Sequence, residues 1–131
     1  MILKNFTNPE ETKCKCGCGL QVKDKIMILL QAFIYILEFV YGGTITCVVN
    51  SGARCPKHNA AEGGALDSQH PHLCAVDCKF FLGKKQLNNS EIATHAVNSR
   101  LFTGVGWKRY ITQGLNLIHL DCRTGNRIAK W

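Results

Sequence analysis

The sequence lacks an apolar run long enough to cross a bilayer, which takes about 20 residues of helix. Its most apolar stretch, residues 26–41, is interrupted by Gln31 and Glu38. We therefore interpret the stretch as a buried core helix and expect no membrane span. The first residues also lack the long apolar core of a signal peptide. We accordingly expect the protein to be cytoplasmic as synthesised.

Internal repeats and low-complexity segments are also missing. A chain of 131 residues, 46% of them hydrophobic, is sufficient for one core, so we expect a single domain over residues 1–131 and a monomer. The net charge of +7 favours anionic partners. However, the basic residues are scattered in short pairs and form no basic helix, so we expect no nucleic-acid binding.

Cysteine is abundant, with eight residues, yet no CxxC pair is present. In a secreted protein this number would suggest disulfides, but the missing export signal favours free thiols or a metal clip. Cys14, Cys16 and Cys18 alternate, and alternate residues of an extended strand share a face, so they can converge on a second metal. Packed or redox-labile thiols are the alternative. We expect these three thiols to be exposed and reactive, and Cys74 and Cys78 to be buried.

The order of predicted elements indicates an α+β fold, a small antiparallel sheet with one main helix and short flanking helices. The main helix is expected over about residues 22–41, ended by Gly42-Gly43. Residues rich in β-branched and apolar side chains predict strands at 44–50, 74–81 and 115–122.

Shorter features complete this prediction. Residues 1–20 are interpreted as a Cys-rich N-terminal arm, and residues 56–67 as a short helix and loop. Asn89 or Ser90 is expected to cap a short helix that continues to about residue 98. Gly104 and Gly106 are expected to end this helical region.

Two histidines and one aspartate are candidate metal ligands, His70, Asp77 and His119. Two imidazoles and a carboxylate match a catalytic zinc site, where three protein ligands leave a fourth position for water. Asp77 has apolar neighbours, and a buried carboxylate needs a partner, which a metal would supply. The alternative is that His70 lies in a loop and Asp77 makes a local hydrogen bond.

Ordered motifs surround these residues: Ser51-Gly52-Ala53-Arg54, His58-Asn59, Gly63-Gly64-Ala65, Ser68-Gln69-His70, Ala75-Val76-Asp77, Gly104-Val105-Gly106-Trp107 and Ile118-His119-Leu120-Asp121. In this order they resemble the zinc D-Ala-D-Ala carboxypeptidase family, with its SGxR, HN, GGA and SxHxxGxAxD motifs, then a Gly-x-Gly turn and an [IV]-H-[ILV]-D strand. Residues 14–19 resemble the start of its phage and bacterial peptidoglycan peptidases. The resemblance extends from about residue 12 onward.

The resemblance implies a hedgehog-like and D-Ala-D-Ala-peptidase-like fold and a Zn²⁺ ion held by His70, Asp77 and His119. It also implies that Arg54 binds substrate and steadies the developing oxyanion, a role that suits a planar cation. Ser68 is a further candidate for substrate contact, and it is expected to shape the loop that delivers His70.

The implied mechanism is metal-assisted hydrolysis, in which a carboxylate accepts a proton from water. Asp121 is the nearest acidic candidate, and it can equally be a residue that orients a histidine ligand. Leu73 replaces a family glycine, and it is strained there if the position needs a positive φ. Asn116 and Leu117 stand where relatives carry an acid or a histidine.

The function that follows is hydrolysis of peptide bonds in peptidoglycan stem peptides, by a carboxypeptidase or a lysin-type endopeptidase released to the cell wall at lysis. The alternative is an inactive zinc-binding module that binds cell-wall peptides, as hedgehog-type relatives suggest. A cysteine-rich structural or redox protein is a third interpretation, based only on the number of thiols.

Overall fold

The computed structural model describes residues 9–63 and 68–131. Within these ranges the predicted α+β class is confirmed. The helices are η1 (Pro9–Thr12), α1 (Asp24–Tyr41), α2 (Pro56–Ala61), η2 (His70–His72), α3 (Asn89–Ser99) and α4 (Lys108–Thr112). The strands are β1 (Ile45–Ser51), β2 (Ala75–Leu82), β3 (Lys85–Gln86), β4 (Gly104–Gly106), β5 (Ile118–Asp121) and β6 (Ala129–Lys130). Gly64 and Ala65 of the third motif and the first eight residues of the expected arm lie outside the described residues.

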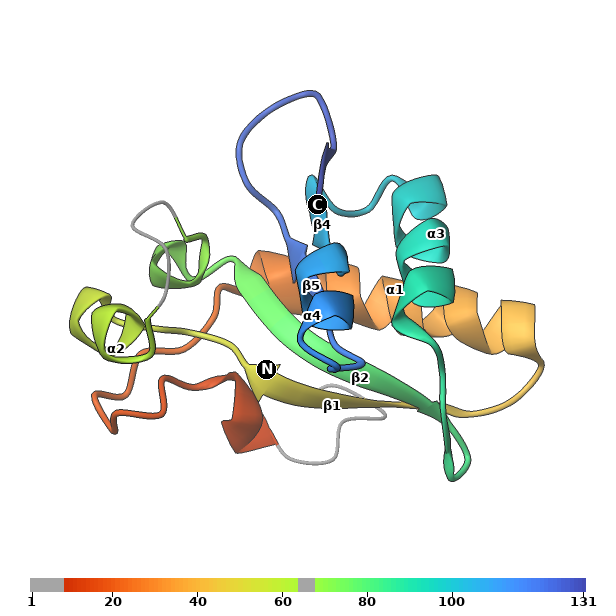
Figure 1. Cartoon of the computed structure of the whole chain (residues 1–131), viewed down its shortest axis with the longest axis horizontal. Coiled ribbons are helices and arrows are strands. Elements are labelled where there is room, and N and C mark those ends of the chain that lie inside the picture. Colours follow the sequence, from red (N-terminus) through yellow and green to blue (C-terminus); the bar gives the residue numbers. More distant parts are fainter. Residues whose placement is uncertain (1–8, 64–67) are drawn as a thin grey trace.

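The strands form one sheet in the order β1-β2-β5-β4-β6, and β3 pairs with the end of β2. Their pairings are antiparallel except for β4 with β6, which is parallel, so the sheet is mixed. The parallel pair forms because the chain loops out after β5 and returns alongside β4, as the dark blue segment of Figure 1 shows.

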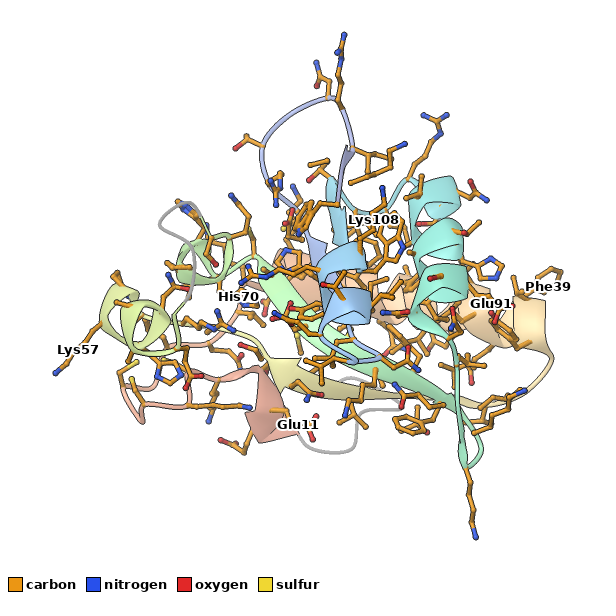
Figure 2. The ribbon with its side chains drawn as sticks, in the orientation of Figure 1. Glu11, Phe39, Lys57, His70, Glu91 and Lys108 are labelled. Atoms are coloured by element: carbon orange, nitrogen blue, oxygen red, sulfur yellow. The ribbon has the colours of Figure 1, made fainter. Side chains whose placement is uncertain are left out.

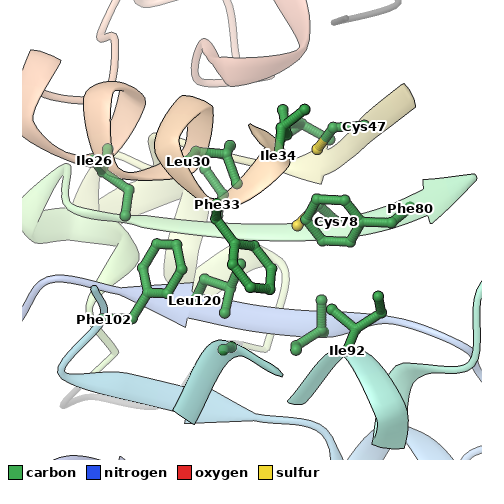
Figure 3. Close-up of a cluster of buried hydrophobic side chains, with 14 of the residues drawn as sticks. Ile26, Leu30, Phe33, Ile34, Cys47, Cys78, Phe80, Ile92, Phe102 and Leu120 are labelled. Carbon is green, nitrogen blue, oxygen red and sulfur yellow. The ribbon is translucent and has the colours of Figure 1, made fainter. Parts of the chain in front are cut away.

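The long helix α1 covers one face of the sheet, and Figure 1 shows α4 in front of the opposite face. The predicted helix is confirmed, including its glycine stop, because Gly42 adopts φ 70° and donates its N–H to the carbonyl of Glu38. Phe33 of α1 meets Phe80 and Phe102 edge to face, with ring centroids 5.6 and 5.4 Å apart (Figure 3). No helix in the described ranges is long and apolar enough to cross a membrane.

The alternation of side chains along β5 separates the core from the site. Ile118 and Leu120 are buried in the core beneath α1, so His119 and Asp121 point to the other face. The strand register places His119 opposite Asp77 of β2 and opposite Gly106 of β4. Two of the candidate ligands therefore lie side by side on the face that carries α4.

Two predictions of local structure are wrong. The cap of α3 is Asn88, whose side chain accepts the N–H groups of Ser90 and Glu91, so neither Asn89 nor Ser90 is the cap. Gly104 and Gly106 do not form a turn but lie in strand β4, because β5 pairs with them. No pattern in the sequence predicted α4 or β6.

The cysteines follow the prediction in part. Cys74 and Cys78 are buried, as expected, and Cys16 and Cys18 are exposed. Cys14 was expected to be exposed, but it is buried, because the loop after η1 packs Cys14 into the hydrophobic core. All eight thiols lie in the described residues and are free.

Candidate metal centre

The turn η2 delivers His70 to the site. Ser68 accepts the N–H of His70 through its hydroxyl (3.3 Å), and the N–H of Leu73 donates to the carbonyl of His70 (3.0 Å). Leu73 closes the turn with φ 61°, so the position does need the left-handed conformation that a glycine adopts easily. In the view of Figure 2, His70 lies between α2 and α4.

One nitrogen of each candidate imidazole is engaged away from the centre of the site. His70 Nδ1 donates to the carbonyl of Gly52 (2.7 Å), and His119 Nε2 donates to Asp121 (2.7 Å). A carbonyl and a carboxylate only accept, so these partners assign the protons. The other two nitrogens face Asp77, with His70 Nε2 at 3.0 Å and His119 Nδ1 at 2.9 Å from its oxygens.

These three side chains fit a tetrahedral metal ion. One ligand atom from each lies within 4.8 Å of the other two, and all three residues are buried. Zinc bonds of 2.0–2.1 Å to nitrogen or oxygen place neighbouring ligand atoms about 3.3 Å apart, close to the separations seen here. The structure therefore brings together the His70, Asp77 and His119 set that the sequence indicated.

The charges at the centre stabilise one another. Burial alone would raise the pKa of Asp77, but hydrogen bonds from His119 and His70 outweigh it and hold that pKa well below its usual range. Burial lowers the pKa of His119, whereas its bonds to Asp121 and Asp77 raise it to about 9. The raised pKa favours the charged form of His119, with a proton on both ring nitrogens, and a metal at Nδ1 would have to displace the proton there.

Asp121 lies behind His119 and is fully buried. Its carboxylate accepts from His119 and from the Nε, Nη2 and backbone N–H of Arg123. Burial raises the pKa of Asp121, but these donors outweigh it and lower the pKa to about 2. Since Asp121 binds the nitrogen of His119 that points away from Asp77, its position suits a residue that orients a ligand.

Arg54 follows β1 and reaches the same centre. Its Nη2 lies 3.7 Å from Asp77 Oδ2. Its Nε donates to the hydroxyl of Ser51 (3.0 Å), and its Nη1 donates to Asn59 Oδ1 (3.4 Å). The serine of the SGxR motif and the asparagine of the HN motif thus hold the guanidinium in place, which explains their fixed spacing from Arg54.

The ligands lie in an open pocket of about 430 Å³ that Ser68 also lines. Beyond Arg54, it is lined by Trp107, which directly follows the Gly-x-Gly motif, and by residues that the sequence did not single out: Arg109, Tyr110 and Arg123. Arg109 and Tyr110 belong to α4, which had no signal. Burial and the nearby Asp77 carboxylate raise the pKa of Tyr110, so its hydroxyl stays protonated.

Trp131 and Gly106 of β4 complete the wall of the pocket. The ring of Trp131 lies 5.1 Å from the ring of His119, and Arg123 stacks over it at 4.7 Å. A side chain at Gly106 would collide with this indole, and one at Gly104 would collide with the carboxylate of Asp121. The Gly-x-Gly motif is therefore required for clearance on both sides of His119.

The comparisons with known proteins agree with this geometry. A family model described as Peptidase M15 matches residues 4–121, a range that contains the three candidate ligands, Arg54 and Asp121. No curated protein matches the chain.

Proposed function

Because the chain belongs to the peptidase M15 family, we propose that it is a zinc-dependent hydrolase of peptide bonds in peptidoglycan stem peptides, of carboxypeptidase or endopeptidase type. The observation that carries the proposal is the convergence of His70, Asp77 and His119 in a pocket lined by arginines. His70 Nε2, an Asp77 oxygen and His119 Nδ1 would hold the ion. When bound, zinc supplies a Lewis acid that activates water and polarises the peptide carbonyl.

Arg54 is proposed to act on the substrate beside the metal. Ser51 and Asn59 accept hydrogen bonds from its Nε and Nη1. Other N–H donors of the guanidinium therefore remain for a carbonyl oxygen on which negative charge develops. Such preorganised donors are worth more in a pocket than in water because no solvent has to reorganise during the reaction.

The charge of the pocket supports an anionic peptide as substrate. Three guanidinium groups, those of Arg54, Arg109 and Arg123, line it. Arginine binds carboxylates through paired hydrogen bonds, and the stem peptides of peptidoglycan carry free carboxylates at their ends and side chains. Ser68 lies on the same wall and is the proposed additional contact.

The general base is assigned among the carboxylates of the described pocket. Asp77 is a proposed ligand, and Asp121 is held behind His119 by Arg123. Glu62 lines the pocket at the end of α2 with an exposed side chain, which lies 3.7 Å from His58. We therefore assign the proton transfer to Glu62 and the orientation of His119 to Asp121.

The test combines metal analysis with digestion of purified cell walls. His70→Ala, Asp77→Ala and His119→Ala should each remove one zinc ion and abolish release of peptide fragments. His72→Ala is the matched control, because His72 belongs to the same turn but is exposed, so zinc and activity should stay. If all three ligand variants retain the full zinc content, the metal site is refuted.

One observation favours the alternative, a zinc-binding module without turnover. Asn116 stands where relatives carry an acid, and both ends of its amide hydrogen-bond to the backbone. Its Oδ1 accepts the N–H of Asn89 (2.8 Å), and its Nδ2 donates to the carbonyl of Leu87 (3.2 Å). Asn116 therefore connects the first residue of α3 to the segment before β5, which is a structural role and not a catalytic one. Wild-type protein that holds zinc and binds stem peptides, but releases no fragment from any of them, would establish this alternative.

A further inference from the structure

A second group of metal-binding side chains lies outside the pocket. The Sγ atoms of Cys14, Cys16, Cys18 and Cys55 all lie within 4.8 Å of one another. Three come from the loop after η1 and the fourth from the cap of α2, and Figure 1 shows this loop running beside α2. We propose that these four cysteines bind a structural zinc ion, separate from the His-Asp-His site.

The separations between the sulfur atoms match a metal site. Zinc–sulfur bonds of about 2.3 Å in a tetrahedron place the sulfurs about 3.8 Å apart. The Sγ of Cys16 lies 3.3 Å from that of Cys14 and 3.6 Å from that of Cys55. A disulfide requires about 2.05 Å, so no pair is bonded. Four sulfurs at such distances suit zinc or iron, and among ions without redox chemistry they suit zinc.

Backbone donors support the thiolate form that a metal requires. The N–H of Cys55 donates to Cys14 Sγ (3.4 Å), and the N–H of His58 donates to Cys55 Sγ (3.3 Å). Hydrogen bonds to a charged form stabilise it.

The loop is shaped so that its three cysteines converge. Gly17 and Gly19 adopt φ values of 84° and 83°, which a residue with a side chain rarely adopts. The N–H of Cys14 donates to the carbonyl of Leu20 (2.8 Å), which closes the loop. The thiols meet because the chain turns tightly, and not because they alternate along an extended strand as the sequence suggested.

The location of this site gives it a structural role. Cys55 directly follows Arg54, and the N–H of Ala53 donates to the carbonyl of Thr12 (2.9 Å), so the segment from η1 already contacts the Arg54 loop. Cys16 and Cys18 are exposed, so burial does not hold them in place. A bound ion would fasten this loop to the chain that carries Arg54.

The experiment measures metal content and cobalt spectra of the full chain purified under reducing conditions. Wild type should hold two zinc ions, and the double variant Cys16→Ser/Cys18→Ser should hold one. Cys122→Ser, which removes a thiol outside the cluster, should keep both. With cobalt in place of zinc, wild type and Asp77→Ala should both show the thiolate-to-cobalt charge-transfer band, and the double variant should lose it.

Three outcomes would overturn the proposal. The first is a zinc content that the double variant leaves unchanged, with no charge-transfer band in wild type. The second is iron in place of zinc. The third is a disulfide within the cluster in metal-free protein, detected by mass spectrometry without reduction. None of these readouts depends on peptide hydrolysis, and Asp77→Ala removes only the other ion, so failure of the proposed function is distinguished.

Discussion

The substitution Asp121→Asn separates the two roles that the sequence left open for this residue. Asparagine has the same shape, so it fits the space beside Gly104 that admits Asp121. Its amide oxygen can still accept from His119 Nε2, but the negative charge is lost. Because that charge helps raise the pKa of His119 to about 9, the imidazole should become a weaker ligand in the variant.

The expected size follows from the contact with His119. Residues that orient a metal-binding histidine typically change metal affinity by about 10–100-fold, or about 1.4–2.8 kcal/mol. Asp121→Asn should therefore bind zinc more weakly by this factor, and its kcat should recover when zinc is in excess. A general base would behave differently, since its loss should lower kcat by about 10²–10⁴-fold at saturating zinc.

The assay is a zinc titration against a chromophoric chelator, followed by kcat measured across zinc concentrations. Gly104→Ala is the matched perturbation, because an added methyl group would displace the Asp121 carboxylate without changing its charge. Both variants should shift zinc affinity in the same direction. Wild-type zinc affinity together with lost turnover in Asp121→Asn would refute the orienting role and make Asp121 the base.

Three further predictions concern stability and catalysis. Leu73→Gly should be about 1 kcal/mol more stable than Leu73→Ala in urea unfolding, because Leu73 adopts φ 61° and the left-handed region costs residues with a side chain; the opposite order would contradict this. Folding raises the pKa of His119 from 6.5 to about 9, which corresponds to about 3 kcal/mol of stability in the metal-free protein. This stabilisation should be complete below pH 6.5 and lost as the pH rises through 9. Urea unfolding midpoints measured across this pH range would show the loss. Glu62→Gln and Arg54→Lys should each keep zinc and lower kcat, the first by about 10²–10⁴-fold, and unchanged kcat would exclude the residue concerned.

The resemblance indicated the three candidate ligands, and local patterning explains why two of them lie on the same face of the sheet. His119 lies between two core residues of β5, so its face was fixed once the strand was recognised. The contact with Asp77 follows from the strand register, which apolar patterning sets wherever one face is buried. The ligand set itself came from the resemblance, through the order of the motifs, and the family match confirms that resemblance.

The missed features depend on contacts between distant segments. Helix α4 has five residues, too few to show a helical period, so Arg109 and Tyr110 could not be assigned to the pocket. Gly104 and Gly106 resemble a helix break because glycine favours turns, whereas the structure requires them for clearance against Asp121 and Trp131. The exposure of Cys14 was predicted wrongly because its burial depends on core residues distant in sequence, which the local spacing of cysteines does not reveal.

Residues 51–59 connect the two proposed metal sites. The carbonyl of Gly52 fixes His70, Ser51 and Asn59 hold Arg54, and Cys55 belongs to the sulfur cluster. Asp77 and His119, by contrast, are held by the sheet. Loss of the ion from the cysteine cluster should therefore displace Arg54 before it disturbs the sheet ligands. On this argument, Cys16→Ser/Cys18→Ser should lower kcat more than it lowers zinc affinity at the His-Asp-His site, and the reverse order would mean that the cluster supports the ligands instead.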